Sequence, residues 1–225
     1  DTISFRFRWI ENRIDRKKME GIFMRRTIVA TVCIVLAAGV AGAQITGSDH
    51  DFSNTTWSTT ICLPCHTTHD GVTDFVAPLW NHQVTTAQFT MYTSDTLDGA
   101  VDPQPADVSK ACLSCHDGTV ALENFGGVTN GDTFITGGAL IGTDLSNDHP
   151  ISVVYSAGTG TGQDAELNPT SAPYADATIA DYLFANKVEC ATCHDVHNGG
   201  AVGTNPFLLV EDPAGSLMCL SCHAK

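Results

Sequence analysis

Four copies of the pentapeptide Cys-x-x-Cys-His constrain this chain more than any other feature. They begin at Cys62, Cys112, Cys190 and Cys219, and together they use every cysteine after Cys33. This spacing is typical of c-type haem attachment, because two thiols can form thioethers with one porphyrin while the adjacent histidine ligates its iron. We therefore expect four haem c groups, one for each motif.

The residues of these motifs, numbered 1 to 4 in chain order, divide into two expected roles. The expected thioether cysteines are Cys62, Cys65, Cys112, Cys115, Cys190, Cys193, Cys219 and Cys222. The expected proximal iron ligands are His66, His116, His194 and His223. Zinc ribbons and redox disulfides also use Cys-x-x-Cys, but neither needs a histidine after the second cysteine. Four histidines in that position favour haem.

The segment 24–43 has the pattern of a secretory signal peptide. Two arginines follow Met24, an apolar run comes next, and small residues precede Gln44. The run is too short to span a bilayer comfortably, so we expect cleavage before Gln44 and removal of Cys33. We interpret residues 1–23 as an over-extended gene start.

The expected mature chain, residues 44–225, is strongly acidic. It keeps 3 lysines and 21 acidic residues, a formal net charge of −18, whereas the whole chain has −14. Such a surface disfavours nucleic acid and anionic lipid and attracts cations or oxidised metal and mineral surfaces. We expect an exported protein without a transmembrane span, located extracellularly or at the cell surface, or alternatively in the periplasm.

Haem density predicts the fold class. The mature segment offers so few residues per porphyrin that the cofactor must supply much of the apolar interior. We expect mostly coil with short α-helices and few short strands, a haem-templated multihaem cytochrome c. Its expected parts are a haem-pair unit at 50–116, a Gly/Thr/Ser-rich insertion at 117–189 and a second haem-pair unit at 190–225.

A few short elements are expected within this coil. Residues 134–136 and 151–155 have the composition of short strands, and 177–186 predicts a helical turn before motif 3. Each Cys-x-x-Cys-His is expected to occupy one helical turn.

Five histidines of the mature chain lie outside the motifs and could supply sixth iron ligands. They are His50, His69, His82, His149 and His197. Four irons need four such ligands, and only Met91 and Met218 offer an alternative thioether, so we expect bis-histidine coordination and low potentials.

The position of each histidine limits which iron it can reach. His69 and His197 stand three residues after a proximal histidine, and such a chain of roughly 10 Å cannot round a porphyrin edge. Each must serve a neighbouring haem. His149, before a proline and beside a carboxylate, is another expected ligand. His50 and His82 compete for the last position, so one is spare or is donated to another subunit.

The order of these motifs carries a resemblance over about residues 50–225. His-Asp-Phe-Ser, Cys-x-x-Cys-His-x-x-His, Pro-Leu-Trp-Asn-His, Cys-Leu-Ser-Cys-His-Asp-Gly-Thr, Asp-His-Pro-Ile-Ser, Cys-x-x-Cys-His-Asp-Val-His-Asn and a final Cys-Leu-Ser-Cys-His follow one another. This order resembles the tetrahaem extracellular cytochrome nanowire family of the outer-membrane cytochrome E type. The resemblance implies stacked and T-shaped bis-histidine haem pairs, head-to-tail filaments and an axial histidine shared between subunits.

The sequence therefore predicts an electron carrier and not an enzyme. We expect a homopolymeric filament that exchanges electrons with redox partner cytochromes or extracellular metal or mineral acceptors. A soluble periplasmic tetrahaem shuttle is the alternative within this class. A multihaem reductase, the alternative from another class, would need an iron with an exchangeable position, whereas five histidines are present for four irons.

Overall fold

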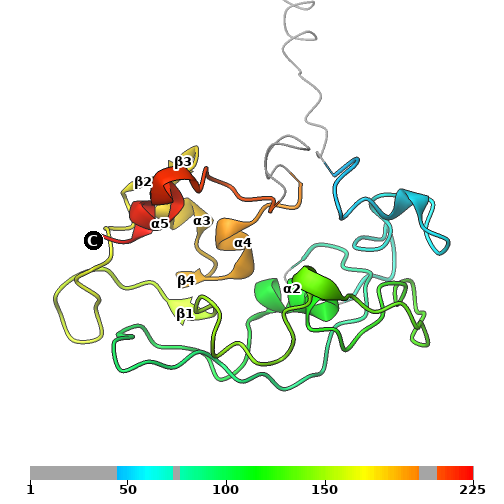
Figure 1. Cartoon of the computed structure of the whole chain (residues 1–225), viewed down its shortest axis with the longest axis horizontal. Coiled ribbons are helices and arrows are strands. Elements are labelled where there is room, and N and C mark those ends of the chain that lie inside the picture. The colour runs from blue at the N-terminus through cyan, green and yellow to red at the C-terminus, as the bar shows by residue number, and fades with distance from the viewer. Residues whose placement is uncertain (1–44, 73–76, 198–206, 225) are drawn as a thin grey trace, which may run out of the picture. The chain divides into compact units, whose positions relative to one another are not determined.

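Coil dominates the computed structural model, which describes residues 45–72, 77–197 and 207–224. The predicted signal peptide at 24–43 and the segment 1–23 lie outside these residues. The regular elements are short: η1 (Phe52–Asn54), α2 (Asp107–His116), η2 (Gly137–Ala139), β1 (Val153–Val154), β2 (Pro173–Tyr174), β3 (Ala177–Thr178), α3 (Ile179–Tyr182), β4 (Lys187–Val188), α4 (Cys190–Cys193), η3 (Ala214–Ser216) and α5 (Leu217–Cys222). The predicted fold class is confirmed (Figure 1).

Two antiparallel strand pairs connect the second half of the chain. β1 pairs with β4, with Val153 opposite Val188, and β2 pairs with β3 in a tight hairpin. The pairing of β1 with β4 brings the expected strand near residue 153 directly to the start of motif 3. A strand at 134–136 was also expected, and this prediction is wrong: these residues are coil and leave Phe134 exposed. Without an apolar partner, a short segment of strand-forming residues gains little from pairing.

Three of the four motifs lie on helices. α2 contains motif 2, α4 begins with the first cysteine of motif 3, and α5 contains the cysteines of motif 4. Motif 1 forms a single hydrogen-bonded turn, in which the His66 amide donates to the Cys62 carbonyl at 2.8 Å. Pro64 lies inside this turn. The expectation of one helical turn for each motif is confirmed.

Two small apolar clusters support these helices. Phe89, Leu113 and Leu145 form the first cluster, and α2 supplies its central leucine. Tyr155, Tyr174 and Ile179 form the second, against which α5 packs through Met218 and Cys222. Burial in each cluster is worth about 25 cal/mol per Å² of apolar surface, so clusters this small contribute modestly. The polypeptide alone thus has little core, as the haem density predicted.

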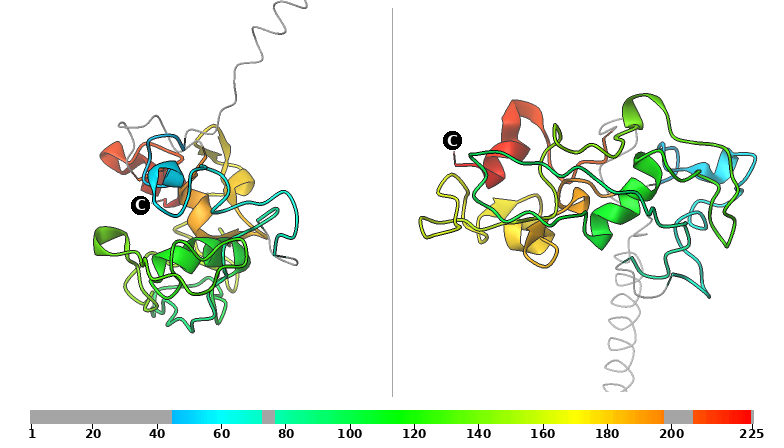
Figure 2. Two further views of the ribbon diagram at one scale, coloured as in Figure 1. Left: turned by 90° about the vertical axis from the view of Figure 1, so that its right-hand side faces the viewer. Right: turned by 90° about the horizontal axis from the view of Figure 1, so that it is seen from below.

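Helix contacts bring the motifs of the two halves together. α2 packs against α4, and α5 packs against β2, as the separate views also show (Figure 2). The predicted helical turn at 177–186 is confirmed by α3, which begins at Ile179 after a capping box made by Thr178 and Asp181.

No helix among the described residues is long and apolar enough to span a bilayer.

Candidate haem attachment and iron-ligand sites

The helical turn of each motif presents its cysteines and histidine together. In motifs 3 and 4 the histidine amide donates to the carbonyl of the first cysteine, at 3.0 Å for His194 and 2.8 Å for His223. Such a turn places residues three and four apart on one side of the backbone. The two thiols and the imidazole can therefore all bind one planar porphyrin. All eight motif cysteines are free thiols.

Three proximal imidazoles are oriented by a backbone carbonyl. The Nδ1 atom of His66 lies 2.8 Å from the Pro78 oxygen, and that of His116 lies 2.8 Å from the Ala139 oxygen. His194 Nδ1 lies 2.7 Å from the oxygen of residue 207. A carbonyl oxygen only accepts, so Nδ1 carries the hydrogen in each ring. Nε2 is then left with a lone pair, which is the arrangement found in metal-binding histidines.

Three of the additional histidines face a proximal histidine. Ring centroids are separated by 6.1 Å for His66 and His197, by 6.0 Å for His50 and His116, and by 6.4 Å for His149 and His223. Two imidazoles bonded to opposite sides of one metal at about 2 Å would place their centroids roughly 6 Å apart. The residues present therefore fit an iron between the rings of each pair.

Burial makes two of these facing rings resist protonation. It lowers the pKa of His50, with a further contribution from His116, and it lowers the pKa of His149. Nδ1 of His50 is buried and has no hydrogen-bond partner among the described residues. A neutral imidazole is the form that binds a metal, so burial favours the ligating state.

His82 has a different environment from the facing histidines. It is 2 % exposed, and both ring nitrogens face carbonyls: Nδ1 lies 2.9 Å from the Gln83 oxygen and Nε2 lies 3.1 Å from the Ala121 oxygen. Its Nε2 also lies 3.6 Å from the Cys115 sulfur. Burial lowers the pKa of His82, so the ring is neutral and donates its single N–H to one of these two carbonyls beside motif 2.

His69 is exposed on the turn that follows motif 1. Its amide donates to Thr67 Oγ1 at 3.5 Å. The corresponding His197 is held similarly, with its amide donating to Asp195 Oδ1 at 2.7 Å. His69 and His197 have the same spacing after their motifs, and each lies in the same kind of local turn.

Thiols of successive motifs lie close to one another. Charges on Cys65 and Cys115 would interact, the thiols of Cys112 and Cys190 shift each other's pKa in opposite directions, and Cys193 is near the cysteines of motif 4. In a haem-bound chain these sulfurs would be thioethers, so their proximity marks neighbouring porphyrin edges. The contacts run in the order motif 1, 2, 3, 4.

The environment of three of the motif thiols suits a neutral sulfur, whereas the neighbouring Cys112 thiol lowers the pKa of Cys190. Burial raises the pKa of Cys65 to about 11, that of Cys115 to about 12 and that of Cys222 to about 11. A metal-binding cysteine needs the opposite shift, because the thiolate is the ligand. Among the described residues, no group of three or more His, Cys, Asp and Glu side chains is arranged to hold a bare metal ion.

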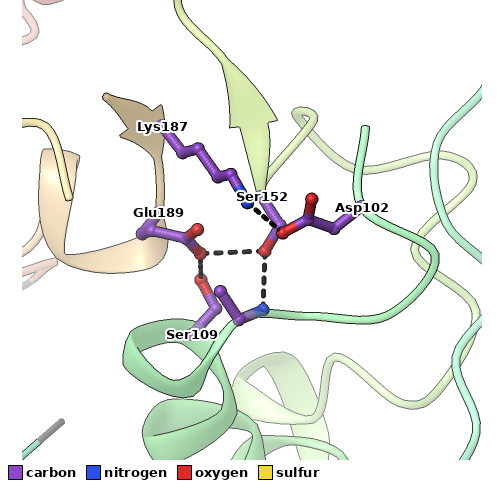
Figure 3. Close-up of polar contacts among 6 residues, drawn as sticks. Asp102, Ser109, Ser152, Lys187 and Glu189 are labelled. Atoms are coloured by element: carbon purple, nitrogen blue, oxygen red, sulfur yellow. Dashed lines mark hydrogen bonds and ion pairs between the residues drawn. The ribbon is translucent and has the colours of Figure 1, made fainter. Parts of the chain in front are cut away.

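A buried polar cluster between motifs 2 and 3 was missed from the sequence. Ser109 and Ser152 both donate to the Glu189 carboxylate, and Lys187 pairs with Asp102 beside them (Figure 3). Burial raises the pKa of Glu189 despite these hydrogen bonds and the nearby lysine. A glutamate immediately before the motif 3 cysteine was the available signal, but its serine partners are distant in sequence.

Tyr174 is a second residue that the sequence did not indicate. It is fully buried, its hydroxyl donates to the Thr192 carbonyl at 3.0 Å, and burial raises its pKa strongly. Interactions with Cys193 and Cys222 contribute to that shift, so the ring lies between motifs 3 and 4.

The carboxyl-terminal part of the chain matches a known family. Residues 183–225 match the family described as Doubled CXXCH motif, and they contain motifs 3 and 4. The match supports a multihaem c-type cytochrome. No curated protein matches the chain. The doubled motif therefore supports covalently bound haem c and a role in electron transfer.

Proposed function

We propose that the chain holds four haem c groups, one for each motif, and transfers single electrons without making or breaking bonds in a substrate. When bound, each haem supplies an iron that alternates between the ferric and ferrous states. The observation that carries the proposal is the set of three histidine pairs with centroids 6.0 to 6.4 Å apart. A structural surface protein has no need for such pairs.

The ring pairs suggest three of the four sixth ligands. We assign His197 to the iron of motif 1, His50 to that of motif 2 and His149 to that of motif 4, since each faces the corresponding proximal histidine. His197 belongs to the motif 3 segment. This assignment agrees with the limit that a histidine three residues after a proximal one serves a neighbouring haem.

The internal repeat supplies the fourth assignment. His69 stands after motif 1 as His197 stands after motif 3, and both are held by the same kind of turn. Because the motif 3 segment donates His197 to motif 1, we assign the reciprocal ligand, His69, to the iron beside His194. His82 is then the spare histidine, since both of its ring nitrogens already face carbonyl oxygens.

Imidazole ligands on both sides of each iron favour low reduction potentials. Methionine would raise the potential, but both available thioethers are used in packing: Met91 contacts the Phe89 cluster and Met218 contacts the Tyr174 cluster. Histidine nitrogens are therefore the side-chain atoms that we propose as the sixth iron ligands.

Contacts between successive motifs provide a continuous path. The polypeptide keeps Cys65 beside Cys115 and Cys112 beside Cys190, and it keeps Cys193 near motif 4. Closely spaced attachment sites keep the distance between electron carriers short. The role of the protein matrix is thus to hold four attachment sites in sequence order.

Location and partners extend this proposal. The predicted leader and the acidic mature segment support export, followed by exchange with redox partner cytochromes or with cationic metal and mineral acceptors. The motif order that resembles extracellular nanowire cytochromes supports head-to-tail assembly into a filament, for which an open heterologous contact is sufficient. A soluble periplasmic shuttle would use the same four sites without assembly.

Mass spectrometry together with spin-state spectroscopy tests the function. We expect the purified mature protein to carry four covalent haem additions and to give ferric spectra that are entirely low-spin. Fewer additions, or a persistent high-spin iron in the wild type, would contradict the proposal, and the latter would favour a reductase. Electron micrographs of the secreted material separate filaments from a soluble shuttle.

A further inference from the structure

The junction between motifs 2 and 3 is made by buried hydrogen bonds. Ser109 lies in α2, one turn before Cys112, and its Oγ donates to Oε2 of Glu189. The same Oγ accepts from the backbone amide of Cys190 at 3.0 Å. One hydroxyl thus joins the helix of motif 2 to the first cysteine of motif 3 and to its capping residue, and the bond to the capping residue Glu189 is drawn in Figure 3.

Ser152 closes this cluster from a third segment. Its Oγ accepts from the Ala106 amide at 2.8 Å and donates to Glu189 Oε2 at 3.0 Å. Its backbone amide donates to Val188, and its carbonyl accepts from Asp102. Ser152 has a φ of 54°, a left-handed conformation that is costly for a serine and persists only where the surroundings fix it.

Both helices begin at this cluster. Ala106 caps the amino terminus of α2 and Glu189 caps that of α4, and each is bonded to Ser152. Ser109, Ser152 and Glu189 are all buried, so none of these bonds competes with bulk water. The side chains of Cys112 and Cys190 meet directly beside them.

We propose that Ser109, Ser152 and Glu189 form a clamp that fixes the separation of the second and third haem attachment sites. The clamp joins the two haem-pair units at the step from motif 2 to motif 3, while the facing rings of His66 and His197 join the same units at motif 1. These three are positioning residues, because they act through Cys112 and Cys190. The inference rests on the proposed function only in taking these cysteines as attachment sites.

Wild-type hydrogen exchange gives the first test. The Cys190 amide belongs to the first turn of α4, where an N–H has no partner within the helix. In the haem-loaded protein we expect this amide to exchange as slowly as amides buried in α2, because it donates to Ser109. Exchange at the rate of an unprotected helix terminus would overturn the proposal without any variant.

Substitutions give the second test. In Ser109→Ala we expect the Cys190 amide to exchange roughly tenfold faster, as for loss of one buried hydrogen bond, and the Soret circular dichroism couplet from neighbouring haems to change. Glu189→Gln keeps an oxygen that accepts from both serines, so it should retain most of the couplet. The control is Ser94→Ala, since the Ser94 hydroxyl also makes a side-chain hydrogen bond, to Thr96 Oγ1 at 3.0 Å, but it is exposed and lies outside every motif.

The outcomes separate the clamp from the function. If Ser109→Ala kept the wild-type exchange rate at the Cys190 amide and an unchanged couplet, the clamp would be overturned, as it would by an equal change in Ser94→Ala. Covalent haem number is measured by mass spectrometry on the same samples. A deficit in the wild type would contradict the proposed function, whereas slow exchange at Cys190 would still support the clamp.

Discussion

The ring centroids of His66 and His197 lie 6.1 Å apart, although His66 ends the first motif and His197 stands three residues after the third. Their interplanar angle is 28°. A histidine from the second half of the chain thus faces the proximal ligand of the first. This relationship makes the two halves interdependent, and it leads to the first prediction.

Replacing His197 with alanine should leave the iron of motif 1 with one imidazole. We expect about a quarter of the ferric haem to become high-spin, because one iron in four loses a strong-field ligand. Electron paramagnetic resonance measures the fraction. The control is His82→Gln, which should keep all haems low-spin and lose about 1–3 kcal/mol of stability through its buried hydrogen bonds. If His82→Gln gave a high-spin signal and the His197 variant did not, His82 would be the iron ligand and His197 the spare histidine.

Dilution should distinguish a ligand from the same chain from one supplied by another subunit. His50 faces His116 within one chain, so we expect the low-spin fraction of the wild type to stay constant as the protein is diluted through dissociation of any assembly. His50→Ala should produce a high-spin iron at every concentration. Visible absorption across a dilution series checks both. Loss of low-spin haem on dilution of the wild type would indicate donation between subunits instead.

Glu189 should make stability depend on pH in an unusual direction for a carboxyl group. Burial raises its folded pKa above the ordinary value of 4.5, so the native state binds more protons than the unfolded state between the two values. Its contribution to stability is full below 4.5 and is lost as pH rises through the folded pKa. Denaturant unfolding of wild type and Glu189→Gln across this range should show the difference. Parallel curves for the two proteins would refute the prediction.

Removing the Tyr174 hydroxyl should weaken the packing between motifs 3 and 4. Its bond to the Thr192 carbonyl is buried, so Tyr174→Phe should lose about 1 kcal/mol, or roughly 2–4 °C in Tm. Calorimetry measures the shift. Tyr182→Phe serves as the comparison, since that hydroxyl bonds to Asp176 at the surface and should change Tm less. Equal Tm shifts in the two variants would mean that burial does not strengthen the Tyr174 hydrogen bond relative to the surface bond of Tyr182.

The sequence predicted those features that depend on neighbouring residues. One helical turn for each motif, the helix near residue 179 and the strand near residue 153 all follow from local spacing and composition. The fold class followed from the small number of residues for each expected haem, which leaves little polypeptide to form a core. The strand expected at 134–136 did not form because strand-like composition alone does not provide a pairing partner.

Features that depend on distant residues could not be read in this way. Ser109, Ser152 and Glu189 are ordinary polar residues in the sequence. The pairing of β1 with β4 brings Ser152 to Glu189, and the packing of α2 against α4 brings Ser109 to the same carboxylate. The backbone carbonyls that orient the proximal histidine rings could not be predicted from the sequence either, because every residue has a carbonyl. Spacing alone did predict that His197 must serve a neighbouring haem, but it gave no means to choose motif 1.

The place of His197 in the chain has a consequence for truncated forms of the protein. His66 and the ring that faces it are separated by 131 residues, so this pair exists only after the segment that follows motif 3 has folded back onto motif 1. Under the proposed function, a fragment that ends before residue 190 would hold the motif 1 haem with one imidazole. Such a fragment would bind small exogenous ligands that the full chain excludes.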